Sequence, residues 1–138
     1  MTKILVVDDQ PCVRESLSDA LISEGYQIAT AGDAESVKGY LRSSRLDLVL
    51  LDLYLDGPDG FALLRDIKRQ YPRLPVIIVT AYDTFMSDPR LSKADGYVIK
   101  GANFADLKKS IARVLGKQSV TRADNKRDLR SMRCETAP

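Results

Sequence analysis

The sequence contains no histidine and no tryptophan, and its only two cysteines, Cys12 and Cys134, lie near opposite ends of the chain. Without histidine a histidine-based catalytic triad is excluded, and two distant cysteines do not make a zinc site or a disulfide framework. No apolar stretch approaches the roughly 18 residues that cross a membrane. The N-terminus also lacks the apolar core and cleavage site of a signal peptide. We therefore expect a cytoplasmic protein with reduced thiols and no membrane insertion.

The chain also lacks a strong charge of either sign, with 21 Lys and Arg against 19 Asp and Glu in 138 residues. Residues 1–116 hold 15 basic and 16 acidic side chains, so we expect no nucleic-acid binding by this part. Residues 117–138 hold six basic and three acidic side chains and show almost no apolar periodicity. We therefore expect one domain over 1–116 and a basic, flexible C-terminal tail over 117–138.

Short apolar runs alternate with amphipathic segments, which predicts an α/β protein with a parallel sheet and helices between the strands. Pro11 and Asp33 are suited to begin the first two helices. Residues 83–93 have a poor helical pattern and contain Pro89, so we expect a short or irregular helix between the last two strands. The strands are expected at Lys3–Val7, Gln27–Ala31, Leu46–Leu51, Leu74–Val79 and Tyr97–Ile99.

Chemically useful side chains follow four of the five predicted strands. Asp8 and Asp9 follow the first, Asp52 the third, Thr80 closes the fourth and Lys100 follows the fifth. Because ligands bind at the carboxyl ends of parallel strands, we expect these groups to converge. Carboxylates without histidine or cysteine favour Mg²⁺. Asp52 can attack phosphorus, while the metal and Lys100 neutralise the phosphoryl oxygens and Thr80 donates a hydrogen bond.

Each residue also has a purely structural explanation. Asp9 alone is equally well explained as a helix N-cap. Thr80 follows ordinary strand preference, and a lysine after a strand is usually a solvated charge. The combination at one edge of the sheet is what favours a phosphoryl-transfer site.

At these residues the chain resembles the receiver domains of response regulators, from Lys3 to about Gly116. The resemblance implies a flavodoxin-like fold with five parallel strands in the order 2-1-3-4-5, two helices on one face and three on the other. The matching stretches are Ile-Leu-Val-Val-Asp8-Asp9 with Arg14 and Leu17, Leu-Val-Leu-Leu-Asp52-Leu with Asp59-Gly60, Val-Ile-Ile-Val-Thr80-Ala81, and Asp95-Gly-Tyr97-Val-Ile-Lys100.

The resemblance implies that Asp52 accepts a phosphoryl group from a sensor histidine kinase or a histidine phosphotransfer protein. Asp8, Asp9 and Asp52 would hold Mg²⁺ together with the backbone carbonyl of Tyr54. The chain would then be a signalling switch in a two-component or phosphorelay pathway, not an enzyme acting on other molecules. Its output would pass to an unidentified downstream protein, and phosphorylation could be linked to dimer formation.

Thr80 and Tyr97 would be the switch residues, and Lys100 would pair with a phosphoryl oxygen. A plain half-buried strand residue is the alternative for Tyr97. The chain departs from the family at Gly101, where receiver domains usually have a proline joined by a cis bond, which is costly before glycine. Because this loop positions Lys100, a phosphorylation-independent interaction module of the receiver type is the alternative function.

An aspartate-nucleophile phosphatase of the haloacid-dehalogenase type is a different class of protein with the same nucleophile. Its motif requires a second acid two residues after the nucleophile, and this chain has Tyr54 there. We therefore reject that class.

Overall fold

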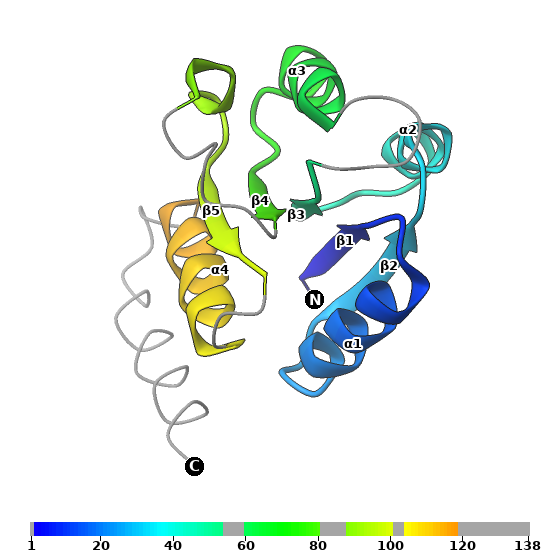
Figure 1. Cartoon of the computed structure of the whole chain (residues 1–138), viewed down its shortest axis with the longest axis vertical. Coiled ribbons are helices and arrows are strands. Elements are labelled where there is room, and N and C mark those ends of the chain that lie inside the picture. The colour runs from blue at the N-terminus through cyan, green and yellow to red at the C-terminus, as the bar shows by residue number, and fades with distance from the viewer. Residues whose placement is uncertain (1, 54–59, 81–87, 101–103, 119–138) are drawn as a thin grey trace.

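The computed structural model describes residues 2–53, 60–80, 88–100 and 104–118. Its strands form one parallel sheet in the order β2-β1-β3-β4-β5, as the resemblance implies (Figure 1). The strands are β1 (Lys3–Val7), β2 (Gln27–Ala31), β3 (Leu48–Leu51), β4 (Val76–Thr80) and β5 (Gly96–Ile99).

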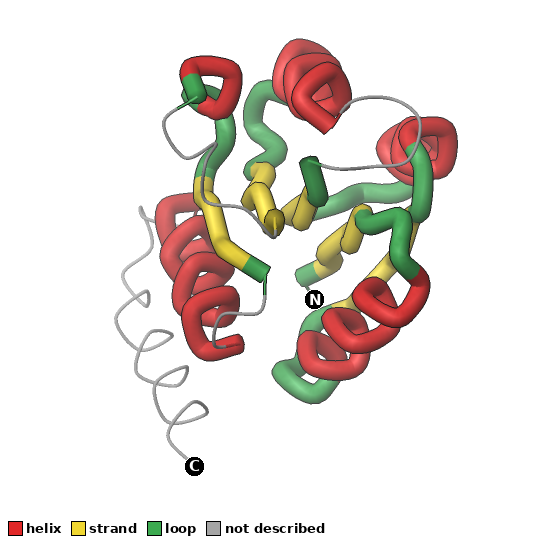
Figure 2. Tube along the Cα trace, viewed as in Figure 1, coloured by secondary structure: helices red, strands yellow, loops and turns green. Residues whose placement is uncertain are grey.

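Helices cover both faces of the sheet (Figure 2). They are α1 (Pro11–Ile22), α2 (Ala34–Ser43), α3 (Gly60–Gln70), the 3₁₀ helix η1 (Pro89–Leu91) and α4 (Phe104–Gln118). One core cluster joins side chains of α1 and α4 to the sheet, and a second joins those of α2, α3 and η1. The described helices therefore divide two against three, and none of them is long and apolar enough to cross a membrane.

The central strands are buried because both of their faces are covered. Along β1, Ile4 and Val6 pack into the α1–α4 core, whereas Leu5 and Val7 pack into the α2–α3 core. This alternation follows from the two-residue period of a strand. Every residue of β3 and β4 is buried, which explains why these strands are continuous apolar runs instead of alternating ones.

The predicted helix starts are confirmed. Pro11 stands in the first turn of α1, where its missing N–H group costs no helix hydrogen bond. Asp33 caps α2, because its carboxylate accepts the Ser36 N–H at 2.7 Å. After α1, Gly25 adopts a positive φ of 96°, a conformation that residues with a side chain rarely adopt.

The two central strands begin two residues later than predicted. β3 begins at Leu48. At the residue before it, the Asp47 N–H donates to the Lys3 carbonyl at 2.8 Å, but the Lys3 N–H donates to the Asp47 carboxylate, also at 2.8 Å, instead of to a strand carbonyl. β4 begins at Val76, because Pro75 has no N–H to donate to the sheet. Its other end extends to Thr80, and β5 begins one residue earlier than predicted, at Gly96.

The segment between β4 and β5 contains only the short helix η1 within its described part. Asp88 caps this helix by accepting the Arg90 N–H at 2.9 Å, and Leu91 is buried in the core. The expectation of a short or irregular helix is therefore confirmed for residues 88–93. Residues 81–87 lie outside the described part, as does the tail beyond α4, which itself ends two residues past the predicted domain boundary.

Candidate functional site

Three carboxylates meet at the carboxyl edge of the sheet, as predicted. Asp8 and Asp52 directly follow β1 and β3, which pair in parallel with Val7 opposite Leu51. Both are buried, at 1% and 4% exposure, and Asp9 is half-buried. One carboxylate oxygen from each of the three lies within 4.8 Å of the others. Unit charges about 4 Å apart repel by about 4 kcal/mol at an effective dielectric constant of 20, so the cluster attracts cations.

Backbone hydrogen bonds fix the two buried acids. The Asp52 N–H donates to the Val7 carbonyl at 3.0 Å, and the Asp8 N–H donates to the Ala31 carbonyl at 3.1 Å. The Asp8 carboxylate accepts the Gln10 N–H at 2.9 Å through Oδ1. The sheet therefore places the carboxylates before any ligand binds.

Lys100 is the internal counter-ion of this cluster. Its Nζ lies 2.6 Å from Asp8 Oδ2 and 3.1 Å from Asp52 Oδ2. Burial by itself would lower the pKa of Lys100, but the hydrogen bonds and charges of Asp8 and Asp52 together outweigh it and raise that pKa above its ordinary value. The side chain is thus a fixed cation beside Asp52.

Thr80 ends β4 with its side chain fully buried. Its hydroxyl Oγ1 has no hydrogen-bond partner in the described part of the chain. An unsatisfied buried hydroxyl costs about 1–3 kcal/mol, so this group is available to a ligand atom that reaches it. The Thr80 carbonyl accepts the Lys100 N–H at 2.6 Å, which ties the two strand ends together.

Tyr97 is half-buried on β5 and packs against the core on the α2–α3 side of the sheet. It also lines a cavity of about 430 Å³ with residues of α4 such as Asp106 and Lys109. This position fits both a switch residue and an ordinary strand residue. Tyr54 and Gly101 lie outside the described residues.

Arg14 has a contact with the site that the sequence reasoning missed. Its Nη1 donates to the Asp8 carbonyl at 2.6 Å, and a Cβ at Gly32 would lie only 2.7 Å from the same nitrogen. The signal was available in the sequence, since Arg14 lies on the first turns of a predicted helix directly after the acids. Its contact with Asp8 depends on the packing of α1 against the end of β2.

Gly60 is a second residue whose role depends on tertiary contact. A Cβ at this position would lie 2.6 Å from Leu53 Cα and 2.8 Å from the Asp52 carbonyl oxygen. Both are backbone atoms, so no side-chain movement could relieve the contact. The glycine therefore permits α3 to approach the backbone that carries Asp52.

The donor set fits a hard divalent cation. Asp8, Asp9 and Asp52 offer only oxygen, and two of them are buried next to a single ammonium group. Such carboxylate groups suit Mg²⁺ or a similar ion. The described residues thus combine three neighbouring carboxylates, two of them buried, with a cation and an unsatisfied hydroxyl.

This fold and edge of the sheet define the receiver class of signalling domain, and comparison with known proteins agrees. The model of the response regulator receiver domain family matches residues 4–112, and the chain belongs to this family. It is a receiver domain of two-component signalling.

Among curated relatives, the chain is 34% identical over 126 residues to the probable transcriptional regulatory protein TcrX of Mycobacterium tuberculosis, covering 88% of this chain and 53% of TcrX. It is 37% identical over 101 residues to the response regulator protein FleR of Pseudomonas aeruginosa, covering 71% of this chain and 21% of FleR. The chain thus spans about half of the first relative and less of the second.

Solved structures show the same fold. The response regulator TrrA of Thermotoga maritima, in complex with Mg²⁺ and BeF, is 38% identical with a TM-score of 0.79, covering 83% of this chain and 99% of TrrA. TrrA has also been solved in complex with the histidine kinase ThkA, where its TM-score is 0.78 at the same coverage. A receiver domain protein of Methanospirillum hungatei is 27% identical with a TM-score of 0.82, covering 88% and 99% of the two chains.

Proposed function

We propose that this chain is a phosphorylation-dependent switch whose phosphoryl acceptor is Asp52. The proposal rests on the surroundings of the Asp52 carboxylate. It is 4% exposed, has the Lys100 ammonium at 3.1 Å and lies within 4.8 Å of the Asp8 and Asp9 oxygens. A buried acid beside a fixed cation and two further acids is suited to phosphoryl transfer.

In the proposed reaction an Asp52 oxygen attacks the phosphorus of a phosphohistidine on a donor protein. The new P–O bond makes an aspartyl phosphate, while the P–N bond to the donor imidazole breaks and that imidazole takes up a proton. Lys100 balances charge on the phosphoryl oxygens, and Thr80 donates its otherwise unsatisfied hydroxyl to one of them. The chain would catalyse only its own phosphorylation and dephosphorylation.

Mg²⁺ is the proposed cofactor, held by Asp8, Asp9 and Asp52 and by the Tyr54 carbonyl, which lies outside the described residues. The presence of Mg²⁺ and BeF in the TrrA complex supports this choice of metal. When bound, the ion would neutralise charge on the phosphoryl oxygens. The chain's own contribution is to hold the three carboxylates at the separation that the sheet enforces.

The switch would run through Thr80 and Tyr97. A hydrogen bond from Thr80 to a phosphoryl oxygen would satisfy a group that is unsatisfied without phosphate. Thr80 pairs with Ile99 across β4 and β5, so Tyr97 lies two residues away on the neighbouring strand. Movement of the end of β4 toward the phosphate would therefore change the packing around the half-buried Tyr97.

The proposed phosphoryl donor is a sensor histidine kinase or a histidine phosphotransfer protein, which the ThkA–TrrA complex supports. The proposed output is binding of an unidentified downstream protein in the cytoplasm, with a phosphorylation-linked dimer as one form. Residues 1–116 would act as the receiver domain, and 117–138 as a basic tail.

The test is the intact mass of the chain after incubation with acetyl phosphate and Mg²⁺. Wild type and the control Asp106→Asn, an exposed acid on α4, should gain one phosphoryl mass, and Asp52→Asn should gain none. If wild type gains none and also fails to bind beryllofluoride, the phosphorylation-independent interaction module becomes the better explanation.

A further inference from the structure

A stripe of exposed cations runs along α2 and beyond its end. Lys38, Arg42 and Arg45 follow one another at spacings of four and three residues and are all exposed. None of the three has an acidic side chain within ion-pair distance among the described residues, unlike Lys68 or Arg90, which do. Lys38 and Arg42 are like charges four residues apart on α2, a spacing that destabilises a helix slightly, although Arg42 also complements the dipole at the end of the helix. Arg45 follows the end of α2 and adds a third cation to the stripe.

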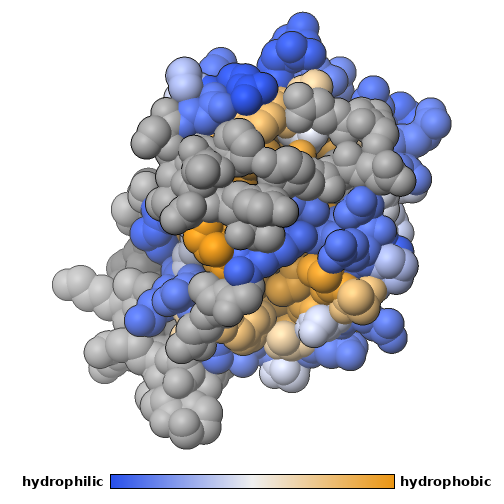
Figure 3. Space-filling view, in the orientation of Figure 1, coloured by the Kyte–Doolittle hydropathy of each residue, from blue (hydrophilic) through white to orange (hydrophobic). Residues whose placement is uncertain are grey.

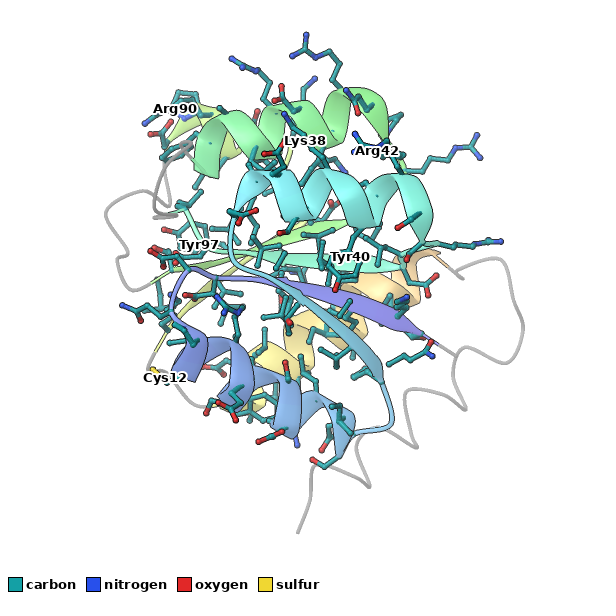
Figure 4. All side chains as sticks on the ribbon, turned by 90° about the vertical axis from the view of Figure 1, so that its right-hand side faces the viewer. Cys12, Lys38, Tyr40, Arg42, Arg90 and Tyr97 are labelled. Carbon is teal, nitrogen blue, oxygen red and sulfur yellow. The ribbon has the colours of Figure 1, made fainter. Side chains whose placement is uncertain are left out.

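The neighbouring helix α3 adds to this positive face. Figure 4 labels Lys38 and Arg42 on the side of α2 that faces α3, and Figure 1 shows the two helices beside each other on one side of the sheet. On α3 the exposed Arg65 and Arg69 share a single acid, Asp66, at 3.7 and 3.0 Å. In the space-filling view hydrophilic residues lie along the outer side of both helices (Figure 3). Together α2 and α3 hold five basic side chains and two acidic ones, Glu35 and Asp66, so their net charge is +3 (5 − 2) although residues 1–116 as a whole are nearly neutral.

The stripe ends at a groove with apolar walls. A hollow of about 360 Å³ lies between the segment after α2 and the segment after α3, and Arg45 and Arg73 both line it. Its apolar lining includes Leu46, Leu74 and the ring of Tyr71. One acid, Asp47, also lines the groove, and its carboxylate already accepts the Lys3 N–H at 2.8 Å.

We propose that this groove and the stripe of Lys38, Arg42 and Arg45 together dock an acidic segment of a partner protein, one that carries an apolar side chain among its carboxylates. The apolar side chain would enter the groove, and the carboxylates would pair with the cations along α2. Arginine suits this role because its planar guanidinium binds a carboxylate through two parallel hydrogen bonds.

The combination of features favours this occupant over others. A nucleic-acid backbone would use the cations but gains nothing from the Leu46, Leu74 and Tyr71 lining. The chain's own residues 117–138 carry a basic excess and would be repelled. An acidic segment with an apolar residue uses both halves of the surface.

The surface is well separated from the phosphoryl site. The groove lies where the chain enters β3 at Leu48, and Asp52 follows the other end of that strand. Four residues of strand span about 13 Å, at roughly 3.3 Å per residue. A partner in the groove would therefore leave Asp52 accessible to a phosphoryl donor.

The experiment uses a short fluorescein-labelled peptide in which Glu and Asp pairs alternate with single Leu residues, titrated with the full chain at low salt. Lys38→Gln/Arg42→Gln/Arg45→Gln should weaken binding by about tenfold, since three favourable exposed charge contacts are lost. The matched control, Lys93→Gln/Lys109→Gln/Arg113→Gln, removes three positive charges from other exposed positions and should bind as wild type does. Replacing the Leu residues of the peptide by Ser should also weaken binding to wild type.

Phosphorylation by acetyl phosphate should be equal in both triple variants, which separates this test from that of Asp52. Equal peptide affinity of the two triple variants would overturn the proposal, as would an absence of binding to wild type. If a short DNA duplex binds as tightly as the peptide and the same three substitutions weaken that binding, the stripe binds phosphate groups instead of carboxylates. If wild type binds no peptide but self-associates, and the stripe variant does not self-associate, the surface binds a second copy of the chain instead.

Discussion

Replacing Lys100 by methionine tests whether the Lys100 ammonium stabilises the folded chain by neutralising the buried acids. Its Nζ contacts Asp8 and Asp52 at 2.6 and 3.1 Å, and those side chains are only 2% and 5% exposed. Removing one partner of a buried ion pair costs about 3–5 kcal/mol, because the other charge is left uncompensated. Since the lysine side chain keeps 21% exposure, we expect the lower end of that range. The free energy of unfolding should therefore fall by about 3 kcal/mol without metal.

Urea unfolding at neutral pH in the presence of EDTA measures this loss. With a denaturant slope of about 2 kcal/mol per molar, the midpoint should fall by about 1.5 M. The control is Lys93→Met, which removes an exposed cation and should change the free energy of unfolding by less than about 0.5 kcal/mol. Saturating Mg²⁺ should narrow the gap between Lys100→Met and wild type, because a bound cation supplies counter-charge to the same carboxylates. A loss below about 1 kcal/mol in EDTA, or a gap unchanged by Mg²⁺, would refute this reasoning.

Three further predictions concern the same edge of the sheet. The pKa of Lys100 in the folded state lies above its ordinary value of 10.5. The stability difference between wild type and Lys100→Met should therefore stay constant from neutral pH to 10.5 and decline only as the pH rises through the folded-state pKa. Paired urea titrations that show a decline near neutral pH would contradict this. Gly60→Ala forces a Cβ to within 2.6 Å of the Leu53 backbone and should lower stability by about 1–3 kcal/mol and weaken beryllofluoride binding. Gly39→Ala is the control, because a Cβ added there meets no atom within 4 Å beyond the helix's own backbone, and it should raise stability by about 0.5–1 kcal/mol. Thermal melts in which the two variants shift the melting temperature in the same direction would contradict the packing argument. Thr80→Val removes an unsatisfied buried hydroxyl and should raise metal-free stability by about 1 kcal/mol while lowering beryllofluoride affinity; lower stability would show that the hydroxyl has a partner.

Several elements of the fold follow closely from local sequence signals. β1 and β2 have the predicted bounds, because each is a short segment with polar or turn residues directly beyond it on both sides. The start of α2 is equally local, since the Asp33 cap bonds to a residue only three positions away. Interactions within a few residues of the chain are readable without a tertiary structure.

The starts of β3 and β4 were mispredicted because long-range partners set them. Asp47 contacts Lys3, which is 44 residues away, so an apolar pattern around Leu46 could not reveal where the ladder begins. The Val76 N–H donates to the Asp95 carboxylate at 2.8 Å, 19 residues away, just after a proline that cannot pair. Hydropathy alone extends both strands too far toward the N-terminus.

The identities of the candidate site residues came from the sequence, because each follows an apolar run and parallel strands deliver their ends to one edge. Their relations came only from the packed structure. The contact of Lys100 with Asp8 and the missing partner of Thr80 depend on side-chain positions that no spacing encodes. The same is true of Arg14, whose bond to the Asp8 carbonyl requires α1 to be docked on the sheet.

By itself, the sequence determined which chemical groups stand at the ends of the strands, since hydrophobic periodicity and turn residues are local properties of the chain. Only the tertiary structure decided how far apart those groups lie and how well water is excluded from them. It also brought Arg45 and Arg73 to one groove from separate loops. Distance and burial determine the strength of charge interactions, and both are set by the packing of helices on both faces of the sheet.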